Sequence, residues 1–167
     1  MTLIRKNFAA AIAAVLIVIG AVGWWMAIDP GGDSAADNRA IIDATTTAEV
    51  QAEVSSGLTQ VLSYDYADPS RTTVALDAVL AGDARKQYDI LFEDLQKNAP
   101  GQQLTMSAEV KTAAVKELSD TEAKLLVFLD QRSERAGDKE ASISAAQLAI
   151  TAEKIKGAWL ITGFKPL

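Results

Sequence analysis

The pattern of hydrophobic and polar positions is most uneven at the start of the chain, where residues 8–28 form 21 consecutive positions without a charge. A helix of that length rises about 30 Å, which matches the hydrocarbon core of a bilayer. Arg5 and Lys6 precede the run and acidic residues follow it, so the positive-inside rule predicts a cytoplasmic N-terminus. Trp24 and Trp25 fall near the outer end, where indole rings favour the headgroup region. We therefore expect a single-pass protein of the cell membrane with an extracytoplasmic C-terminal domain.

Two other interpretations of residues 8–28 stay open, namely a cleaved secretory signal and a buried helix of a soluble domain. We prefer an uncleaved signal anchor, because the apolar region of a cleaved signal spans only about 7–15 residues. A late cleavage site would lie at residues 34–36. The predicted organisation is a cytoplasmic terminus (1–7), a membrane helix (8–28), a linker with proline and paired glycine (29–36) and an exported domain (37–167).

Apolar residues in the next part of the chain recur every three or four positions, which is typical of helices that bury one face. A long helix is predicted over residues 37–63, with Asp37 as its N-cap. A shorter helix is predicted over residues 71–80 and a third over residues 83–97. The third helix is expected to stop at residues 98–101, which contain Pro and Gly.

From residue 104 the hydrophobic period changes to two, which indicates strands. The first strand is predicted over residues 104–110, with a bulge near residues 112–114 where the alternation loses its phase. Lys156-Gly157 predicts a tight hairpin turn. Three more strands are predicted, over residues 123–129, 143–152 and 158–164.

Three helices followed by about four antiparallel strands predict an α+β fold. Because each helix has one apolar face, we expect the helices to cover one face of a curved antiparallel sheet.

Composition narrows the chemistry that such a domain can perform. The chain has no cysteine and no histidine, which excludes disulfides, Ser-His-Asp or Cys-His catalysis and histidine-ligated metals. Arg5 and Lys6 are two of the 16 basic residues, so the exported part carries 14 basic against 22 acidic residues, a net charge of −8. This charge disfavours binding to nucleic acid and adhesion to anionic lipid.

Sequence motifs add a resemblance to a known family. They lie at residues 62–66 (Leu-Ser-Tyr-Asp-Tyr), at 80–88 (Leu-Ala-Gly-Asp-Ala-Arg-Lys-Gln-Tyr) and in the pair 126–131 and 157–161. With the order of elements, they resemble the cone-shaped fold of nuclear transport factor two, also termed cystatin-like. More narrowly, the chain resembles the mammalian cell entry (Mce)-associated membrane proteins of actinobacteria, which join a basic N-terminus and one membrane helix to an exported domain of this fold.

The resemblance implies a non-catalytic function, as an accessory or stabilising subunit of an Mce-type lipid import complex. Its partners would then be the permease and lipid-shuttle proteins of that transporter. One alternative is the assembly-factor subunit of type IV secretion and conjugation systems, which also joins one membrane helix to a domain of this fold. Another is a membrane-tethered domain that binds a lipid or small molecule. Formation of a homo-oligomer stays open.

Candidate site residues are few. Enzymes of related folds use an Asp or His in the apolar cavity, but Asp65, Glu109 and Asp130 are better explained as a turn residue, an outward strand residue and a solvated strand end. We expect no catalytic, cofactor or metal site. A set of aromatic side chains would either line a lipid-sized cavity or fill the core, namely Tyr64, Tyr66, Tyr88, Phe92, Phe128 and Trp159.

The surface is then the most informative part of the domain. We expect a partner protein to dock on the open face of the sheet or on its last strand.

Overall fold

The computed structural model of the chain describes residues 43–136 and 140–167. None of the helices in these two ranges is both long and apolar enough to cross a membrane. Outside the described residues lie the predicted cytoplasmic terminus, membrane helix and linker (residues 1–36), and with them Arg5, Lys6, Trp24 and Trp25.

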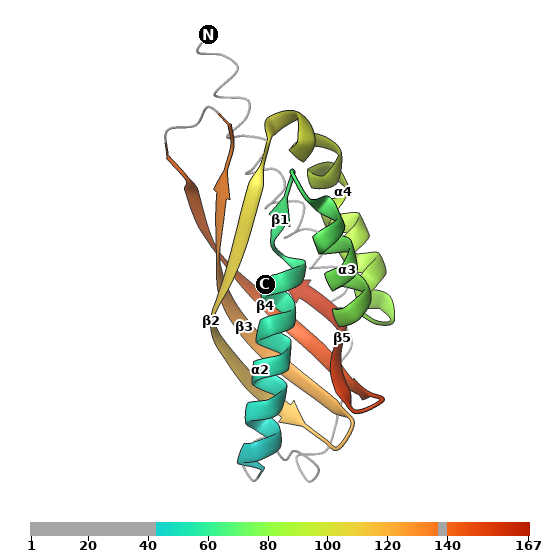
Figure 1. The fold of residues 1–167 in the computed structure, drawn as a ribbon. Helices are drawn as coiled ribbons and strands as arrows, with labels where there is room; N and C mark the ends of the chain where they lie inside the picture. Colours follow the sequence, from blue (N-terminus) through green and yellow to red (C-terminus); the bar gives the residue numbers. More distant parts are fainter. Residues whose placement is uncertain (1–42, 137–139) are drawn as a thin grey trace.

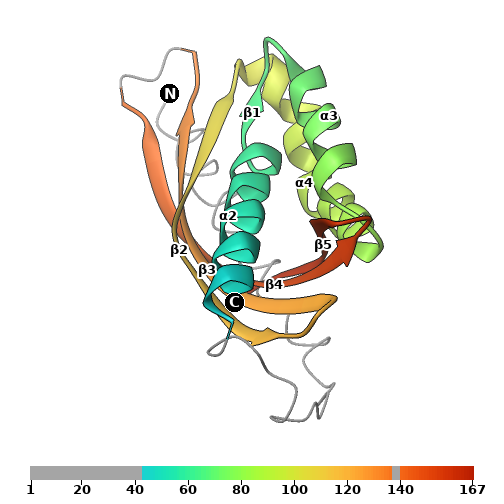
Figure 2. The same ribbon diagram turned by 60° about the horizontal axis from the view of Figure 1, so that its bottom comes forward.

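The described residues form an α+β domain with three helices and one five-stranded sheet, as Figure 1 shows. The strands follow one another in the order β1-β2-β3-β4-β5, and every neighbouring pair is antiparallel. The sheet is curved, and the helices lie on its concave side (Figure 2). The elements are α2 (Ala44–Val61), β1 (Tyr64–Asp65), α3 (Pro69–Val79), α4 (Asp83–Gln102), β2 (Thr105–Leu118), β3 (Glu122–Glu134), β4 (Ser142–Ile155) and β5 (Ala158–Pro166).

The fold class is therefore as predicted, but the sheet has one strand more than the expected four. The additional strand is β1, whose two residues pair with Met106 and Thr105 at the start of β2. The sequence predicts only the end of a helix at this segment, because two residues are too few to show the period of two that marks a strand.

Helix α2 begins later than predicted. Its N-cap is Asp43, whose carboxylate accepts hydrogen bonds from the Thr46 backbone N–H at 2.9 Å and from the Thr46 hydroxyl at 2.8 Å. The predicted cap, Asp37, lies outside the described residues. Both positions carry an aspartate, so residue type alone did not distinguish them. The buried stripe of α2 is made by Val50, Val54, Gly57, Leu58 and Val61.

Two boundaries of the other helices also differ from the prediction. Helix α3 begins at Pro69, because proline is tolerated in the first helical turn where its missing N–H has no partner to lose. Helix α4 continues through Pro100 to Gln102, so the predicted stop at residues 98–101 is wrong. Its last turn is retained because Ala99 is buried, and the Leu104 N–H bonds to the Ala99 carbonyl at 3.0 Å.

All four long strands extend beyond their predicted limits. The register of β2 against β3 shifts between Val110 and Thr112 and again between Val115 and Glu117, so a bulge lies close to the predicted place. Asp130 was expected to end a strand, but β3 continues to Glu134. The Lys156-Gly157 turn is confirmed: both residues have positive φ, at 53° and 91°, as a two-residue hairpin turn requires.

The core lies between the helices and the concave face of the sheet. The α2 stripe packs there with inward residues of all the long strands, such as Leu125, Val127 and Ile161, which are at most 1% exposed. A polar contact ties α2 to its surroundings at its C-terminal end. The Ser63 hydroxyl accepts a hydrogen bond from the Ala108 N–H at 3.1 Å, and the Ser63 carbonyl accepts one from the Thr72 hydroxyl at 3.0 Å.

Candidate functional site

Side chains fill the interior of the cone in the described part of the chain. Tyr88, on α4, is 1% exposed. Its ring stacks on Phe92 with centroids 4.4 Å apart and meets Phe164 of β5 edge to face at 6.5 Å. These aromatic rings join the helical layer to the last strand, where a substrate cavity would otherwise lie.

The six aromatic residues singled out in the sequence do not converge on one point. Tyr64 belongs to a small cluster with Ala99, Leu104 and Met106, while Tyr88 and Trp159 belong to the main core. Phe92 is partly buried and packs against both clusters. Tyr66 and Phe128 are each 37% exposed. Phe128 faces outward because its strand neighbours Val127 and Leu129 point into the core.

Burial raises the pKa of Tyr88 to about 12, with a smaller upward contribution from the negative charge of Asp89. The phenol is therefore neutral at physiological pH, and nothing in this site activates it as an acid or base. Its side chain acts as a large apolar filler with a polar tip.

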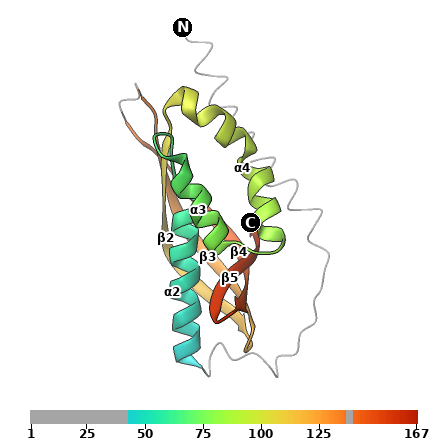
Figure 3. The same cartoon turned by 45° about the vertical axis from the view of Figure 1, so that its right-hand side comes forward.

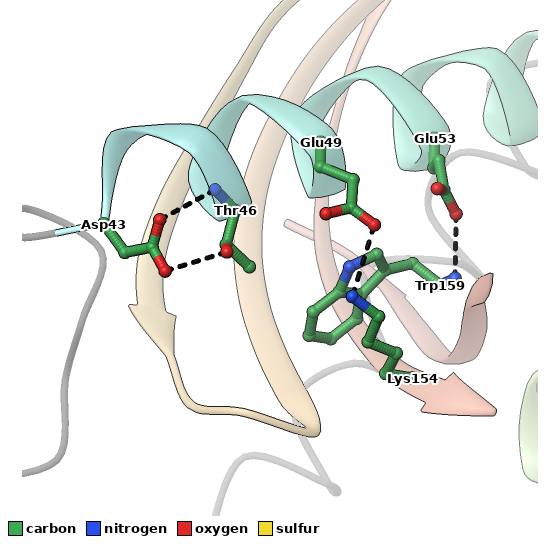
Figure 4. Close-up of polar contacts among 6 residues, drawn as sticks. All are labelled: Asp43, Thr46, Glu49, Glu53, Lys154 and Trp159. Carbon is green, nitrogen blue, oxygen red and sulfur yellow. Dashed lines mark hydrogen bonds and ion pairs between the residues drawn. The ribbon is translucent and has the colours of Figure 1, made fainter. Parts of the chain in front are cut away.

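The best-connected polar cluster ties α2 to the β4–β5 hairpin (Figure 4). The Glu53 carboxylate accepts a hydrogen bond from the Trp159 backbone N–H at 2.8 Å. Lys154 Nζ lies 3.2 Å from the Glu49 carboxylate and 5.5 Å from the centroid of the Trp159 ring. The Trp159 indole N–H is buried and has no hydrogen-bond partner among the described residues. The cluster anchors the hairpin under the helix.

A residue of α4 and one of the α3–α4 connection also cover part of the outer edge of β5. The Gln87 side-chain oxygen accepts a hydrogen bond from the Phe164 N–H at 2.9 Å, and the Ala81 N–H bonds to the Ile161 carbonyl at 2.8 Å. With Glu53, these contacts occupy three of the peptide groups on the edge of β5, namely the N–H of Trp159 and Phe164 and the C=O of Ile161. The last strand is one of the two surfaces expected to dock a partner, and its edge is partly covered by the rest of the chain.

Sequence reasoning missed Glu53 and Gln87. Each is a long polar residue next to a buried position of its helix, since Val54 and Tyr88 follow them directly. A polar residue at the border of an apolar stripe is the signal that could have marked them, because such a side chain can reach a strand edge. Their roles are structural caps of β5.

Two open hollows lie on the surface of the described residues. One, of about 370 Å³, lies between α2 and α3 and includes Glu53, Gln60 and Trp159 in its lining. The other, of about 490 Å³, lies between the start of α4 and β5 and is bordered by Asp83 and Glu153. Neither contains a group of three or more carboxylates that could hold a metal ion, and the rest of the described chain has no such group.

The acidic residues considered from the sequence make local contacts. The Asp65 carboxylate accepts a hydrogen bond from the Ala67 N–H at 2.9 Å, which is the turn role expected of it. Glu109 and Asp130 lie 2.7 Å and 3.7 Å from Lys111 Nζ, and the Glu109 contact raises the pKa of that lysine. These pairs are on the surface, where ion pairs contribute little to stability.

Together, the curved antiparallel sheet and the three helices on its concave side give the described residues a fold of the nuclear transport factor two type. A protein of that superfamily from Salmonella enterica superposes with a TM-score of 0.52 at 11% identity, over 72% of this chain and 92% of that chain. Two further structures share the fold. VirB8 of Agrobacterium tumefaciens has a TM-score of 0.58 at 13% identity, over 72% and 90% of the two chains. CagV of Helicobacter pylori, a VirB8 homologue of a type IV secretion system, has a TM-score of 0.58 at 11% identity, over 72% and 98%.

Sequence comparison gives the family. The chain belongs to the family of the uncharacterized Mycobacterium tuberculosis proteins Rv1362c (strain H37Rv) and MT1407 (strain CDC 1551). It is 32% identical to each over 157 residues, which is 93% of this chain and 69% of theirs. No protein-family model matches the chain.

Proposed function

We propose that the chain is a non-catalytic subunit of a multi-protein transport complex in the cell envelope. Residues 8–28 would hold it in the membrane with the N-terminus inside, and the exported domain would act through contacts with other subunits. The domain would position or stabilise its partners rather than transform a substrate.

The observation that carries this proposal is the filled cone. Enzymes and lipid carriers of this fold need a cavity, and here Tyr88, Phe92 and Phe164 occupy its interior among the described residues. The carboxylates that could serve as a general base contact neighbouring surface groups instead. This arrangement favours a domain that acts through contacts of its surface with other proteins.

Two transport machines are candidates. The likeness to VirB8 and CagV favours an assembly-factor-like role of the type IV secretion kind. The motifs at residues 62–66, 80–88 and 157–161 favour an accessory role in Mce-type lipid import, and the relatives from a mycobacterium agree with that resemblance. We place the assembly-factor-like role first, because it requires only the fold and surface contacts of the domain.

The test is affinity purification of the tagged full-length chain from its host's membranes in mild detergent, with partners identified by mass spectrometry. Recovery of secretion-channel subunits would support the first candidate, and recovery of a lipid permease with its shuttle proteins would support the second. If no envelope transport subunit is enriched, the proposal is wrong.

A matched control separates the domain from its membrane helix. Leu58→Asp places a charge in the core, since Leu58 is 1% exposed, and should unfold the domain while residues 8–28 stay unchanged. Partners that depend on the folded domain should be lost from this variant. Partners retained by it would be contacts of the anchor or of the detergent micelle.

A further inference from the structure

Several peptide groups on the outer edges of β2 and β5 are covered in the described residues. β1, Ser63 and Gln51 cover β2, since the Gln51 side-chain amide donates to the Ala113 carbonyl at 2.7 Å. Glu53, Gln87 and the Ala81 N–H cover β5 as described above. Natural sheets close their edges in this way because open peptide groups invite pairing with another chain.

One stretch of β4 has an edge without such cover. β4 pairs with β3 from Ser142 onward, but its pairing with β5 begins only at Leu148. Figure 1 accordingly shows β5 beside the lower part of β4 alone, and Figure 3 shows the upper ends of β3 and β4 standing clear of α2 and α3. Ser142 to Ala145 are exposed on both faces of the sheet.

The direction of the open peptide groups follows from one hydrogen bond. The Leu167 N–H bonds to the Gln147 carbonyl at 3.1 Å, so the peptide groups of Gln147 point to the β5 side. Peptide groups point to alternate sides along an antiparallel strand, and the register of β3 and β4 is continuous here. Ile143 and Ala145 therefore present their N–H and C=O groups to the open side, where the described residues supply no partner.

The side chains of this stretch do nothing to block pairing. Residues 141–147 contain no charge and no proline, the two features that usually protect an edge. Ile143 is 66% exposed. An uncharged, extended edge with a large exposed apolar residue is suited to the addition of a strand.

We propose that this open edge pairs with the same edge of a second copy of the chain, as an antiparallel two-fold contact centred on Ser144. In that register Ile143 of each copy lies opposite Ala145 of the other. All four open peptide groups of each copy are then used, in four hydrogen bonds across the contact. The proposal does not depend on which transport complex the chain serves.

The charges on β3 do not select the register, because Arg132 is ion-paired with Glu134 and Asp130 with Lys111 of the same chain. Arg132 pairs with Ile143 and Asp130 pairs with Ala145, so both charges lie on the outer face beside the edge. With Ser144 at the centre, each row across the contact begins with Arg132 of one copy and ends with Asp130 of the other. A centre on Ala145 is disfavoured for a different reason, because it would place Gln147, whose carbonyl is already bonded to the Leu167 N–H, opposite Ile143.

The outward side chains also fit this register. The two copies of Ile143 become diagonal neighbours, about 7–8 Å apart, over the small side chain of Ala145. Large residues thus meet small ones across the contact, and Ile143 loses exposure to water. The alternative occupant, an extended segment of another protein, would not need this internal match between Ile143 and Ala145.

The chain has no cysteine, so single cysteines report the contact directly. In the proposed contact, Ser144 of one copy lies opposite Ser144 of the other in a non-hydrogen-bonded pair. The Cα atoms of such a pair are about 4.5 Å apart, so a disulfide can form between cysteines at this position. Full-length Ser144→Cys, purified in mild detergent and oxidised, should give a disulfide-linked dimer. Ser142→Cys is the matched control, because its two copies would be about 14 Å apart along the strands. We expect roughly tenfold more dimer from Ser144→Cys, since only that pair meets the distance limit for a disulfide.

A second variant separates pairing from folding. The Ala145 N–H points away from β3, so Ala145→Pro removes one open donor without breaking the β3–β4 ladder. Combined with Ser144→Cys, it should abolish the dimer while circular dichroism and melting stay as in the parent. Equal cross-linking of the two single-cysteine variants would overturn the proposal. So would cross-linking of Ser144→Cys to a different protein in host membranes, which would make that protein the occupant.

Discussion

At the scale of single residues, Tyr88 shows how one side chain decides what the cone can do. The ring packs between Phe92 and Phe164, and its burial raises the pKa of the phenol to about 12. A residue that the sequence marks as a cavity-lining candidate is thereby part of the packed interior. The difference between the two roles lies in neighbours that approach from other elements, which residue type does not reveal.

The raised pKa of Tyr88 predicts a dependence of stability on alkaline pH. The unfolded chain loses the phenol proton near pH 10 and the folded chain near pH 12. The free energy of unfolding is therefore unaffected by this group below pH 10 and falls as pH rises from 10 toward 12. Tyr88→Phe should remove up to about 2–3 kcal/mol of this loss, because each pKa unit corresponds to about 1.4 kcal/mol. Chemical denaturation at several pH values between 8 and 12 measures it.

The control for this prediction is Tyr66→Phe, which changes a tyrosine that is 37% exposed and lies outside both core clusters. It should follow the profile of the parent protein across the whole range. If Tyr88→Phe lost stability with pH as steeply as the parent, ionisation of Tyr88 would have no part in alkaline unfolding.

At the scale of elements, the close approach of α2 and α3 rests on one glycine. A Cβ atom on Gly57 would lie 2.6 Å from Val79 Cγ1, which is closer than real side chains come. Glycine inside a helix is unfavourable by about 1 kcal/mol relative to alanine. The chain accepts that loss because no larger residue fits between the two helices.

Gly57→Ala therefore brings two opposed effects. The helix gains about 1 kcal/mol of propensity, but overlap with the stiff side chain of Val79 costs about 1–3 kcal/mol. We expect a net destabilisation of roughly 1 kcal/mol, measured by urea denaturation. Adding Val79→Ala should relieve the overlap, so the double variant should be more stable than the sum of the single changes implies.

Gly101→Ala is the matched control, because a Cβ there meets nothing within 4 Å. This substitution should be neutral or slightly stabilising. A Gly57→Ala variant that behaves in the same way would show that α3 moves aside at little cost.

The elements themselves are what the sequence predicted best. Spacings of three and four located the three helices, and the change to a period of two located the long strands, because burial of one face imposes these periods. The predicted boundaries were wrong where a tertiary contact extends an element. Helix α4 continues through the predicted stop at residues 98–101, where Ala99 is buried, and β3 continues beyond Asp130. The candidate site was predicted less well, since caps such as Glu53 and Gln87 are defined by strands that lie far from them in sequence.

At the scale of the whole molecule, the chain combines an apolar N-terminal run with an acidic folded domain. The domain has its own core in the described residues, and polar anchors there run between helices and sheet. Its contacts with partners should then depend on its surface. Residues 8–28 would serve to keep that surface near the membrane.

This division predicts the outcome of exchanging the anchor. Replacing residues 8–28 with an unrelated apolar helix of equal length should preserve the set of proteins recovered by affinity purification, because the domain surface is unchanged. The measurement is the amount of each partner relative to the original chain. Loss of the partners with a correctly inserted chain would make the helix itself an interface.

The bond between Glu53 and the backbone of Trp159 joins residues 106 positions apart in the chain. Among the described elements a ribosome releases α2 first and β5 last, so the helix emerges long before the strand that completes the core. Until then the stripe of Val50, Val54 and Leu58 lacks the part of its cover that β5 supplies. The core is complete only when the final strand arrives, so truncation of β5 should leave part of this stripe exposed to water.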